Sequence, residues 1–155
     1  MLLVKAFIFY DSKYGNTRLA AEKVVEGLSN ECVDVDFGYV NDVNFQCAVD
    51  YDVILLGAPN HMGRPSQTMK KFINKLGLLG LKGTRVAVFG TYAGKERLLD
   101  RSVKKMVTMV TEKLPDVMLL EPSLSVHVKG VSGPLMDGEL SRCIEFGKLI
   151  AHQLK

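Results

Sequence analysis

The six residues Ser12-Lys-Tyr-Gly-Asn-Thr17 combine hydroxyl and amide side chains with one glycine, and such a set can hold a phosphate group. An amphipathic segment follows directly, so unpaired helix N–H groups and the positive end of the helix dipole should face the same ligand. Ser12, Asn16 and Thr17 would add side-chain donors, and Gly15 would let the backbone approach an oxygen. A plain helix N-cap at Asn16 or Thr17 would explain one polar residue but does not require the whole run.

The motifs that this loop lacks narrow the kind of phosphate ligand. The GxxxxGK[ST] pattern of ATP- and GTP-binding loops and the GxGxxG pattern of dinucleotide folds are both absent from the sequence. ATP, GTP and NAD held in those ways are therefore disfavoured. The pattern favours a mononucleotide.

Two later segments have the composition of loops that present a flat surface to a ligand. The segment 57–65 contains two prolines that stiffen it, and Gly63 leaves its backbone free near a ring. Its candidate ligand-contacting residues are Ala58, Pro59, Asn60, His61, Met62 and Gly63. The segment 90–95 carries an aromatic residue between glycines, and its candidates are Thr91, Tyr92, Ala93 and Gly94.

Apolar runs alternate with amphipathic segments along the chain. These runs and segments are the elements that must position the three loops. Five β-prone runs are predicted to be strands, at Leu2–Tyr10, Cys32–Tyr39, Asp52–Gly57, Arg85–Gly90 and Val117–Val128. Four segments with apolar residues at helical spacing are predicted to be helices, at Thr17–Leu28, Ser66–Leu76, Arg97–Leu114 and Gly138–Leu154. Pro122 should interrupt the fifth strand, and Leu140, Cys143 and Gly147 should face inward from the last helix.

This alternation over 155 residues indicates the α/β class, with a single domain at 1–155. We expect a doubly wound, five-stranded parallel sheet with helices on both faces. Right-handed crossovers favour the strand order 2-1-3-4-5. In such a sheet a ligand lies outside the carboxyl ends of the strands beside the first one, where the three candidate loops would meet.

The first loop and the order of elements resemble the flavodoxin family, whose first loop typically reads [S/T]-x-[S/T/Y]-G-x-T and wraps the phosphate of FMN. The resemblance covers the whole chain and implies a flavodoxin-like fold, FMN as cofactor and electron transfer between redox partner proteins. By the same resemblance, the phosphate loop comprises Ser12, Lys13, Tyr14, Gly15, Asn16 and Thr17.

The resemblance also implies roles in the other two loops. Met62 would pack on the flavin ring, and Gly63 would belong to a peptide that turns over to hydrogen-bond the flavin N5. Tyr92 would stack on the outer face of the ring, while Thr91 and Gly94 would offer backbone donors to its pyrimidine edge. The alternatives are ordinary core packing for Met62 and Tyr92, and an exposed loop position for His61 in place of one facing the ring.

Arg64 departs from the family, in which acidic or neutral residues are more usual near the flavin. A cation there should favour the anionic reduced flavin and raise its reduction potential, by an amount that depends on solvent screening.

The end of the chain resembles the flavodoxin domain of the A-type flavoproteins, a domain that there follows a di-iron domain. The matching stretches are 122–126, 140–143 and 146–147. No histidine-rich di-iron half is present in this sequence. We therefore expect any site that reduces oxygen or nitric oxide to lie in another polypeptide.

The composition disfavours several other functions. Three separated cysteines and three histidines without a ligand pair make a protein-bound metal improbable and indicate a cytoplasmic protein with reduced thiols. No apolar run reaches the length of a membrane helix, and the scattered basic residues do not indicate nucleic-acid binding. The net charge of +3 is unusual for a flavodoxin and predicts an acidic docking surface on the partner protein.

We expect an electron carrier that is not an enzyme on its own. Three other functions are the alternatives. An NAD(P)H-dependent quinone or flavin reductase shares the fold, but nothing in the sequence marks a nicotinamide site. A response-regulator receiver needs a phosphoacceptor aspartate after the third strand, where this chain has Gly57-Ala58. The last alternative is a flavodoxin-like partner module that has lost its cofactor.

Overall fold

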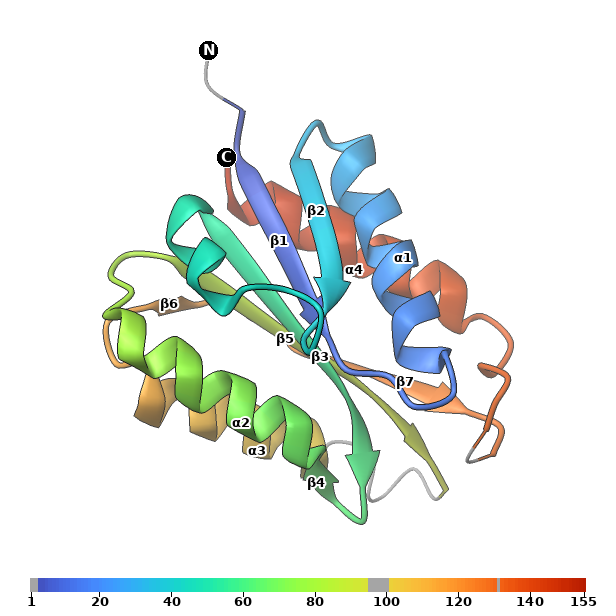
Figure 1. The fold of residues 1–155 in the computed structure, drawn as a ribbon. Coiled ribbons are helices and arrows are strands. Elements are labelled where there is room, and N and C mark those ends of the chain that lie inside the picture. The colour runs from blue at the N-terminus through green and yellow to red at the C-terminus, as the bar shows by residue number, and fades with distance from the viewer. Residues whose placement is uncertain (1–2, 95–100, 131) are drawn as a thin grey trace.

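The computed structural model describes residues 3–94, 101–130 and 132–155, and it contains a twisted sheet between two layers of helices (Figure 1). The strands are β1 (Lys5–Tyr10), β2 (Asp34–Tyr39), β3 (Val53–His61), β4 (Arg64–Pro65), β5 (Arg85–Ala93), β6 (Met118–Leu119) and β7 (Leu124–Val128). The α-helices are α1 (Asn16–Asn30), α2 (Gln67–Leu76), α3 (Arg101–Lys113) and α4 (Glu139–Gln153). Two 3₁₀ turns, η1 (Phe45–Asp50) and η2 (Gly77–Leu79), join them.

The order of the parallel strands confirms the sequence prediction. The strands run β2-β1-β3-β5, and β6 and β7 both pair with the outer edge of β5. Counted as two halves of one strand, β6 and β7 complete the order 2-1-3-4-5. Pro122 lies between the two halves, as predicted, because a proline has no N–H to donate to the neighbouring strand.

Each face of the sheet carries its own apolar core. On one face, α1 and α4 cover alternate residues of the central strands, such as Ile8, Leu55 and Phe89. On the other face, α2, α3 and η1 cover the intervening residues, such as Phe9 and Leu56. Strands buried on both faces have near-continuous apolar sequences, which is the pattern that predicted them.

Helices α1 and α4 touch at two glycines. A Cβ placed on Gly27 would lie 2.1 Å from the carbonyl oxygen of Ile144, and one on Gly147 would lie 2.4 Å from that of Val24. Real atoms do not approach so closely, so the two backbones meet with no side chain between them. The inward position predicted for Gly147 is confirmed, as is that of Cys143.

Several boundaries differ from the prediction. β3 and β5 continue past their expected ends, because Ala58 pairs with Gly90 and Pro59 with Thr91. Leu140 was predicted to face inward but is 38% exposed, because in the first turn of α4 the neighbouring Glu139 is buried instead, where its carboxylate accepts from the His127 N–H of β7. The expected strand start at Leu2 and the helix start at 97–100 lie outside the described residues.

We predict that Gly147→Ala destabilises the fold. The added methyl group must push apart two backbones, and such overpacking costs about 1–3 kcal/mol of unfolding free energy. Urea denaturation followed by far-ultraviolet circular dichroism measures this loss. The control is Ser141→Ala, an exposed position on the same helix, which should change the unfolding free energy by no more than about 0.5 kcal/mol. Equal stability of the two variants would contradict the close contact.

Candidate functional site

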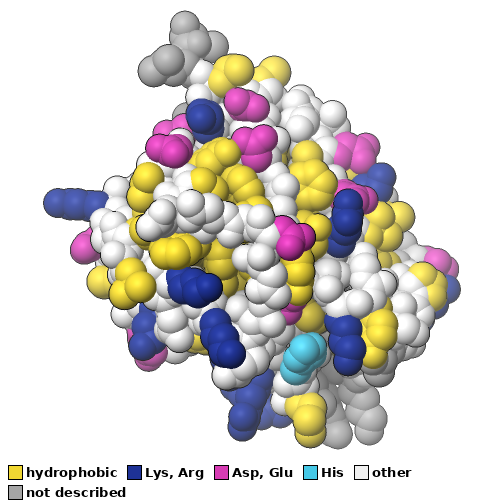
Figure 2. All heavy atoms as spheres, viewed as in Figure 1, with side chains coloured by type: hydrophobic (Ala, Val, Ile, Leu, Met, Phe, Trp, Pro, Cys, Tyr) yellow, Lys and Arg dark blue, Asp and Glu magenta, His cyan; other side chains and the backbone are white. Residues whose placement is uncertain are grey.

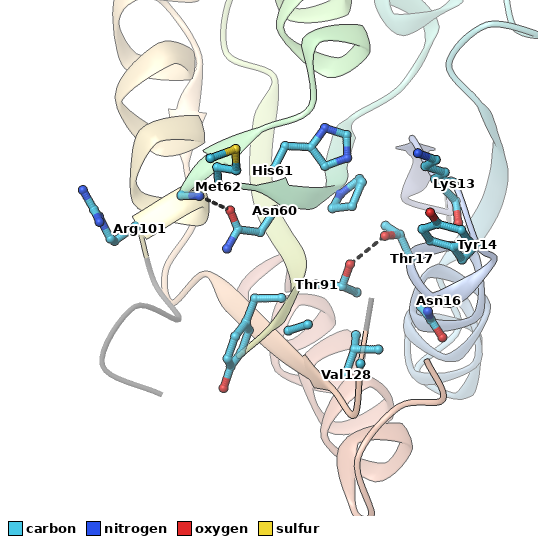
Figure 3. Close-up of a pocket in the computed structure, with 16 residues that line it drawn as sticks. Lys13, Tyr14, Asn16, Thr17, Asn60, His61, Met62, Thr91, Arg101 and Val128 are labelled. Atoms are coloured by element: carbon cyan, nitrogen blue, oxygen red, sulfur yellow. Dashed lines mark hydrogen bonds between the residues drawn. The ribbon is translucent and has the colours of Figure 1, made fainter. Parts of the chain in front are cut away.

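A cleft of about 560 Å³ opens where β1, β3 and β5 end (Figure 3). This volume is in the range of small-molecule sites. Thirteen of the sixteen predicted site residues line it: Ser12, Lys13, Tyr14, Asn16, Thr17, Pro59, Asn60, His61, Met62, Gly63, Thr91, Tyr92 and Ala93. The three candidate loops therefore meet at one place, although they are far apart in the sequence.

The remaining three predicted residues lie beside the cleft rather than in its wall. Gly15 forms the N-cap of α1, Ala58 is fully buried in β3, and Gly94 is exposed after β5. The cleft is also lined by Arg101, Val128 and Gly130, which sequence reasoning missed. Val128 ends the strand next to β5, so the predicted strand order contained a signal for it, whereas nothing in the sequence marked Arg101.

The loop after β1 presents backbone donors to the cleft. Its helix begins at Gly15, whose φ of 91° is left-handed and which has no side chain to act as a cap. Neither Asn16 nor Thr17 is therefore the N-cap, and that simpler interpretation is wrong. Within the described part of the chain, the N–H groups of Asn16 and Thr17 donate to no protein acceptor.

The Ser12 hydroxyl shapes the same loop. It accepts hydrogen bonds from the N–H groups of Gly15 at 3.0 Å and Arg18 at 3.4 Å. These bonds fold the loop over the start of α1. The residues that carry the unpaired N–H groups, Asn16 and Thr17, both line the cleft, where an anion of the size of a phosphate can accept from them.

A buried pair of hydroxyls connects this loop to the middle of the cleft. The Oγ1 atoms of Thr17 and Thr91 lie 2.8 Å apart, and the two side chains are 1% and 5% exposed (Figure 3). Thr17 belongs to the first turn of α1 and Thr91 to β5. The pair therefore fixes the helix start against the sheet at the floor of the cleft.

The segment after β3 is a hairpin rather than the expected loop. His61 pairs with Arg64 across a two-residue turn in which Met62 and Gly63 both have positive φ, 55° and 81°. This is the backbone of a tight hairpin turn, and the Gly63 N–H donates to the Asn60 Oδ1 at 2.6 Å. Positive φ is unusual for methionine, so this turn was hard to predict from the residue types alone.

Met62 occupies the tip of this hairpin. Its side chain is 99% exposed, so the alternative of core packing is wrong. His61 is also exposed and lies at the mouth of the cleft, as Figure 3 shows. Contact of either side chain with a ligand ring stays a prediction.

Tyr92 forms part of the wall on the β5 side. Its ring is 7% exposed and stacks on the imidazole of His127, with centroids 4.6 Å apart and an interplanar angle of 3°. Tyr92 thus already has an aromatic partner in the protein. Its stacking on a ligand also stays a prediction.

Three cationic side chains surround the cleft. Lys13 and Arg101 line it, and Arg64 projects from the hairpin. Among the described residues none of the three takes part in a salt bridge. The guanidinium of Arg101 lies beside the hairpin turn, about 3.7 Å from where a Cβ on Gly63 would be. The site therefore favours an anionic ligand.

The described residues show neither a metal centre nor a membrane span. No group of three or more His, Cys, Asp and Glu side chains in this part of the chain is arranged to hold a metal ion. None of the described helices is long and apolar enough to cross a membrane.

Known proteins of similar length resemble this chain in both sequence and fold. The flavodoxin family model matches residues 8–118. A flavodoxin from Clostridium beijerinckii is 28% identical over 151 residues, which cover 94% of this chain and 98% of the relative. A solved flavodoxin from the domain Archaea has a TM-score of 0.82 at 24% identity, covering 97% of this chain and 99% of that one.

A larger protein contains the same fold as one of its parts. The flavodiiron core of a Synechocystis protein matches with a TM-score of 0.77 at 17% identity. The match covers 97% of this chain but 36% of that protein. At this identity the likeness concerns the fold alone.

We predict that the hydroxyls of Thr17 and Thr91 are energetically coupled. Thr17→Val or Thr91→Val alone leaves one buried hydroxyl unpaired, which costs about 1–3 kcal/mol of unfolding free energy. The double variant removes both hydroxyls and should lose less than the sum of the two single losses. Urea denaturation of the four proteins measures the coupling. Strictly additive losses would show that the two side chains do not interact.

Proposed function

The chain belongs to the flavodoxin family, whose members bind FMN, and we propose that it is an electron carrier between redox partner proteins. The observation that supports this proposal most directly is the meeting of three loops at one cleft. One loop presents unpaired N–H groups, the second a stiff hairpin and the third an aromatic residue. A phosphate attached to a flat ring system needs that combination.

The residues of the cleft fit FMN in both charge and shape. The unpaired N–H groups of Asn16 and Thr17 suit the phosphate, and Lys13 adds a positive charge beside them. The hairpin tip at Met62 and the wall at Tyr92 come from two different segments that both line the cleft. We propose that these two residues enclose the isoalloxazine ring.

The chemistry of the carrier would be that of the cofactor. Bound FMN supplies one-electron oxidation and reduction. The chain's own contribution is to bind the phosphate, orient the ring, exclude water from its faces and set the surrounding charge. The exposed hairpin tip marks the side at which the ring edge would remain accessible to a partner.

An NAD(P)H-dependent quinone or flavin reductase is the second candidate. It would need a nicotinamide site next to the flavin, and no observation in the described residues favours one. Oxidation of NADH by the pure protein in the presence of a quinone would support this candidate over the carrier.

The distribution of charge supports an acidic partner. Figure 2 shows most Asp and Glu side chains of this face in the half near the chain termini. That half contains Asp34, at the start of β2, and Asp50 and Asp52, just before β3. Lys13 lines the cleft at the opposite end, and Arg64 lies on the hairpin whose tip lines it. We propose that a partner docks over the cleft with an acidic surface.

We also propose a cytoplasmic location. All three cysteines carry free thiols, and burial in the core raises the pKa of Cys143 to about 12. Such a thiol stays protonated and unreactive. A chain with separated, unpaired thiols suits a reducing compartment.

We predict that Asn16→Asp weakens FMN binding about tenfold or more, because it places a carboxylate beside the phosphate. An acid in the first helical turn favours the helix dipole, so the fold should keep its stability. Fluorescence titration of the flavin-free protein measures the dissociation constant. Riboflavin, which has no phosphate, is the matched ligand and should bind both proteins equally.

Two outcomes would contradict this prediction. Wild-type protein that gains no flavin absorbance with added FMN would remove the carrier proposal altogether. Equal FMN affinity of wild type and Asn16→Asp would instead show that the phosphate lies elsewhere.

We predict that electron transfer to an anionic acceptor slows as salt rises. The positive rim should attract ferricyanide, and added ions screen that attraction. Stopped-flow oxidation of the reduced protein at increasing sodium chloride measures the effect. The double variant Lys13→Gln/Arg64→Gln should make the oxidation rate depend less on salt. The control Lys155→Gln, at the C-terminus and away from the cleft, should leave the salt dependence unchanged. A wild-type rate independent of salt would contradict the acidic-partner proposal.

A further inference from the structure

The aromatic residue in the wall of the cleft, Tyr92, stacks on a histidine of the neighbouring strand. Tyr92 and His127 are register partners on the parallel strands β5 and β7. Their rings lie 4.6 Å apart and within 3° of parallel. A parallel ring contact of this kind restricts rotation of both side chains. His127 therefore controls where the Tyr92 ring can lie.

The same imidazole also holds the loop that follows Tyr92. Its Nε2 lies 3.0 Å from the carbonyl oxygen of Gly94. A carbonyl oxygen only accepts hydrogen bonds, so the Nε2 must carry a proton and donate it. Gly94 has a left-handed φ of 106°, and no described residue lies within 4 Å of a Cβ placed there. The histidine bond thus fixes the Gly94 carbonyl, directly after the end of β5.

The backbone of His127 is fixed in turn by the start of α4. Its N–H donates to the Glu139 Oε2 at 2.7 Å, and its carbonyl accepts from the Met136 N–H at 2.9 Å. Glu139 is 7% exposed, and its carboxylate is paired with Arg142 at 2.9 Å. Arg142 also donates to the carbonyl of Ser125 at 3.1 Å. The imidazole is therefore attached to a rigid support.

We propose that His127 is a positioning residue for FMN, an inference that rests on the function proposed above. It acts through Tyr92 and Gly94 rather than by touching the cofactor. The stacking contact fixes the plane of the Tyr92 ring, and the hydrogen bond fixes the loop backbone beside it. A flavin then meets a wall that is already ordered, so less conformational entropy is lost on binding.

The two contacts can be separated by substitution. His127→Phe keeps a flat ring on Tyr92 but has no donor for the Gly94 carbonyl. His127→Gln keeps an N–H donor but loses the ring, and His127→Ala loses both. The control is His152→Ala, which removes a histidine from the far end of α4, where it lies 3.4 Å from Glu31.

The expected result is a graded loss of FMN affinity. His127→Ala should raise the dissociation constant about tenfold or more, and the Phe and Gln variants should each raise it about threefold. Visible circular dichroism of the bound flavin should change in all three variants, because it reports how the ring lies against its neighbours. Urea denaturation should show all variants folded, and His152→Ala should match the wild type in every measurement.

The outcomes distinguish this inference from the proposal on which it rests. Wild-type protein that binds no FMN overturns the proposed function and the role of His127 with it. Wild-type protein that binds FMN, together with His127→Ala of equal affinity and unchanged visible circular dichroism, overturns the role of His127 alone. Loss of affinity in His127→Ala with no partial rescue by Phe or Gln would also overturn it, since neither contact would then carry the effect.

Discussion

The parallel register of the three central strands is the constraint on which the site depends. Tyr10 pairs with Gly57, and Gly57 pairs with Phe89, so β1, β3 and β5 reach the same level of the sheet. The loops that leave them must then meet at one rim. A shift of one residue in either pairing would turn the apolar residues of a strand to the opposite face and separate the loops. The buried residues on both faces prevent such a shift.

The sequence was sufficient for the fold and for the place of the cleft, because both follow from short-range patterns. Continuous apolar runs identified the buried strands, and Pro122 identified the break between β6 and β7. Details that depend on tertiary contacts were harder to predict. The hairpin at Met62 depends on a left-handed methionine, and Leu140 is exposed because the neighbouring Glu139 takes the buried position against β7. Arg101 reaches the cleft through the packing of α3, which no local pattern encodes.

Different groups of the molecule act on the binding of a cofactor and on the encounter with a partner. Backbone N–H groups at the start of α1 act over short distances and suit the phosphate of the proposed cofactor. The cations at Lys13, Arg64 and Arg101 act over longer distances and attract whatever approaches the rim. One end of the sheet thus provides both kinds of interaction. Because acidic residues gather at the other end, the molecule has an electric dipole between its two ends.

The glycine contact between α1 and α4 has a consequence for how the two ends of the cleft are related. Helix α4 touches α1 directly at Gly147, and at its own start it supports His127 through Glu139. Helix α4 therefore contacts both α1, whose start is the proposed phosphate site, and the strand that carries the stacking partner of Tyr92. A small shift of α4 along its axis would move both walls together. The distance between the walls therefore depends on a helix none of whose described residues lines the cleft.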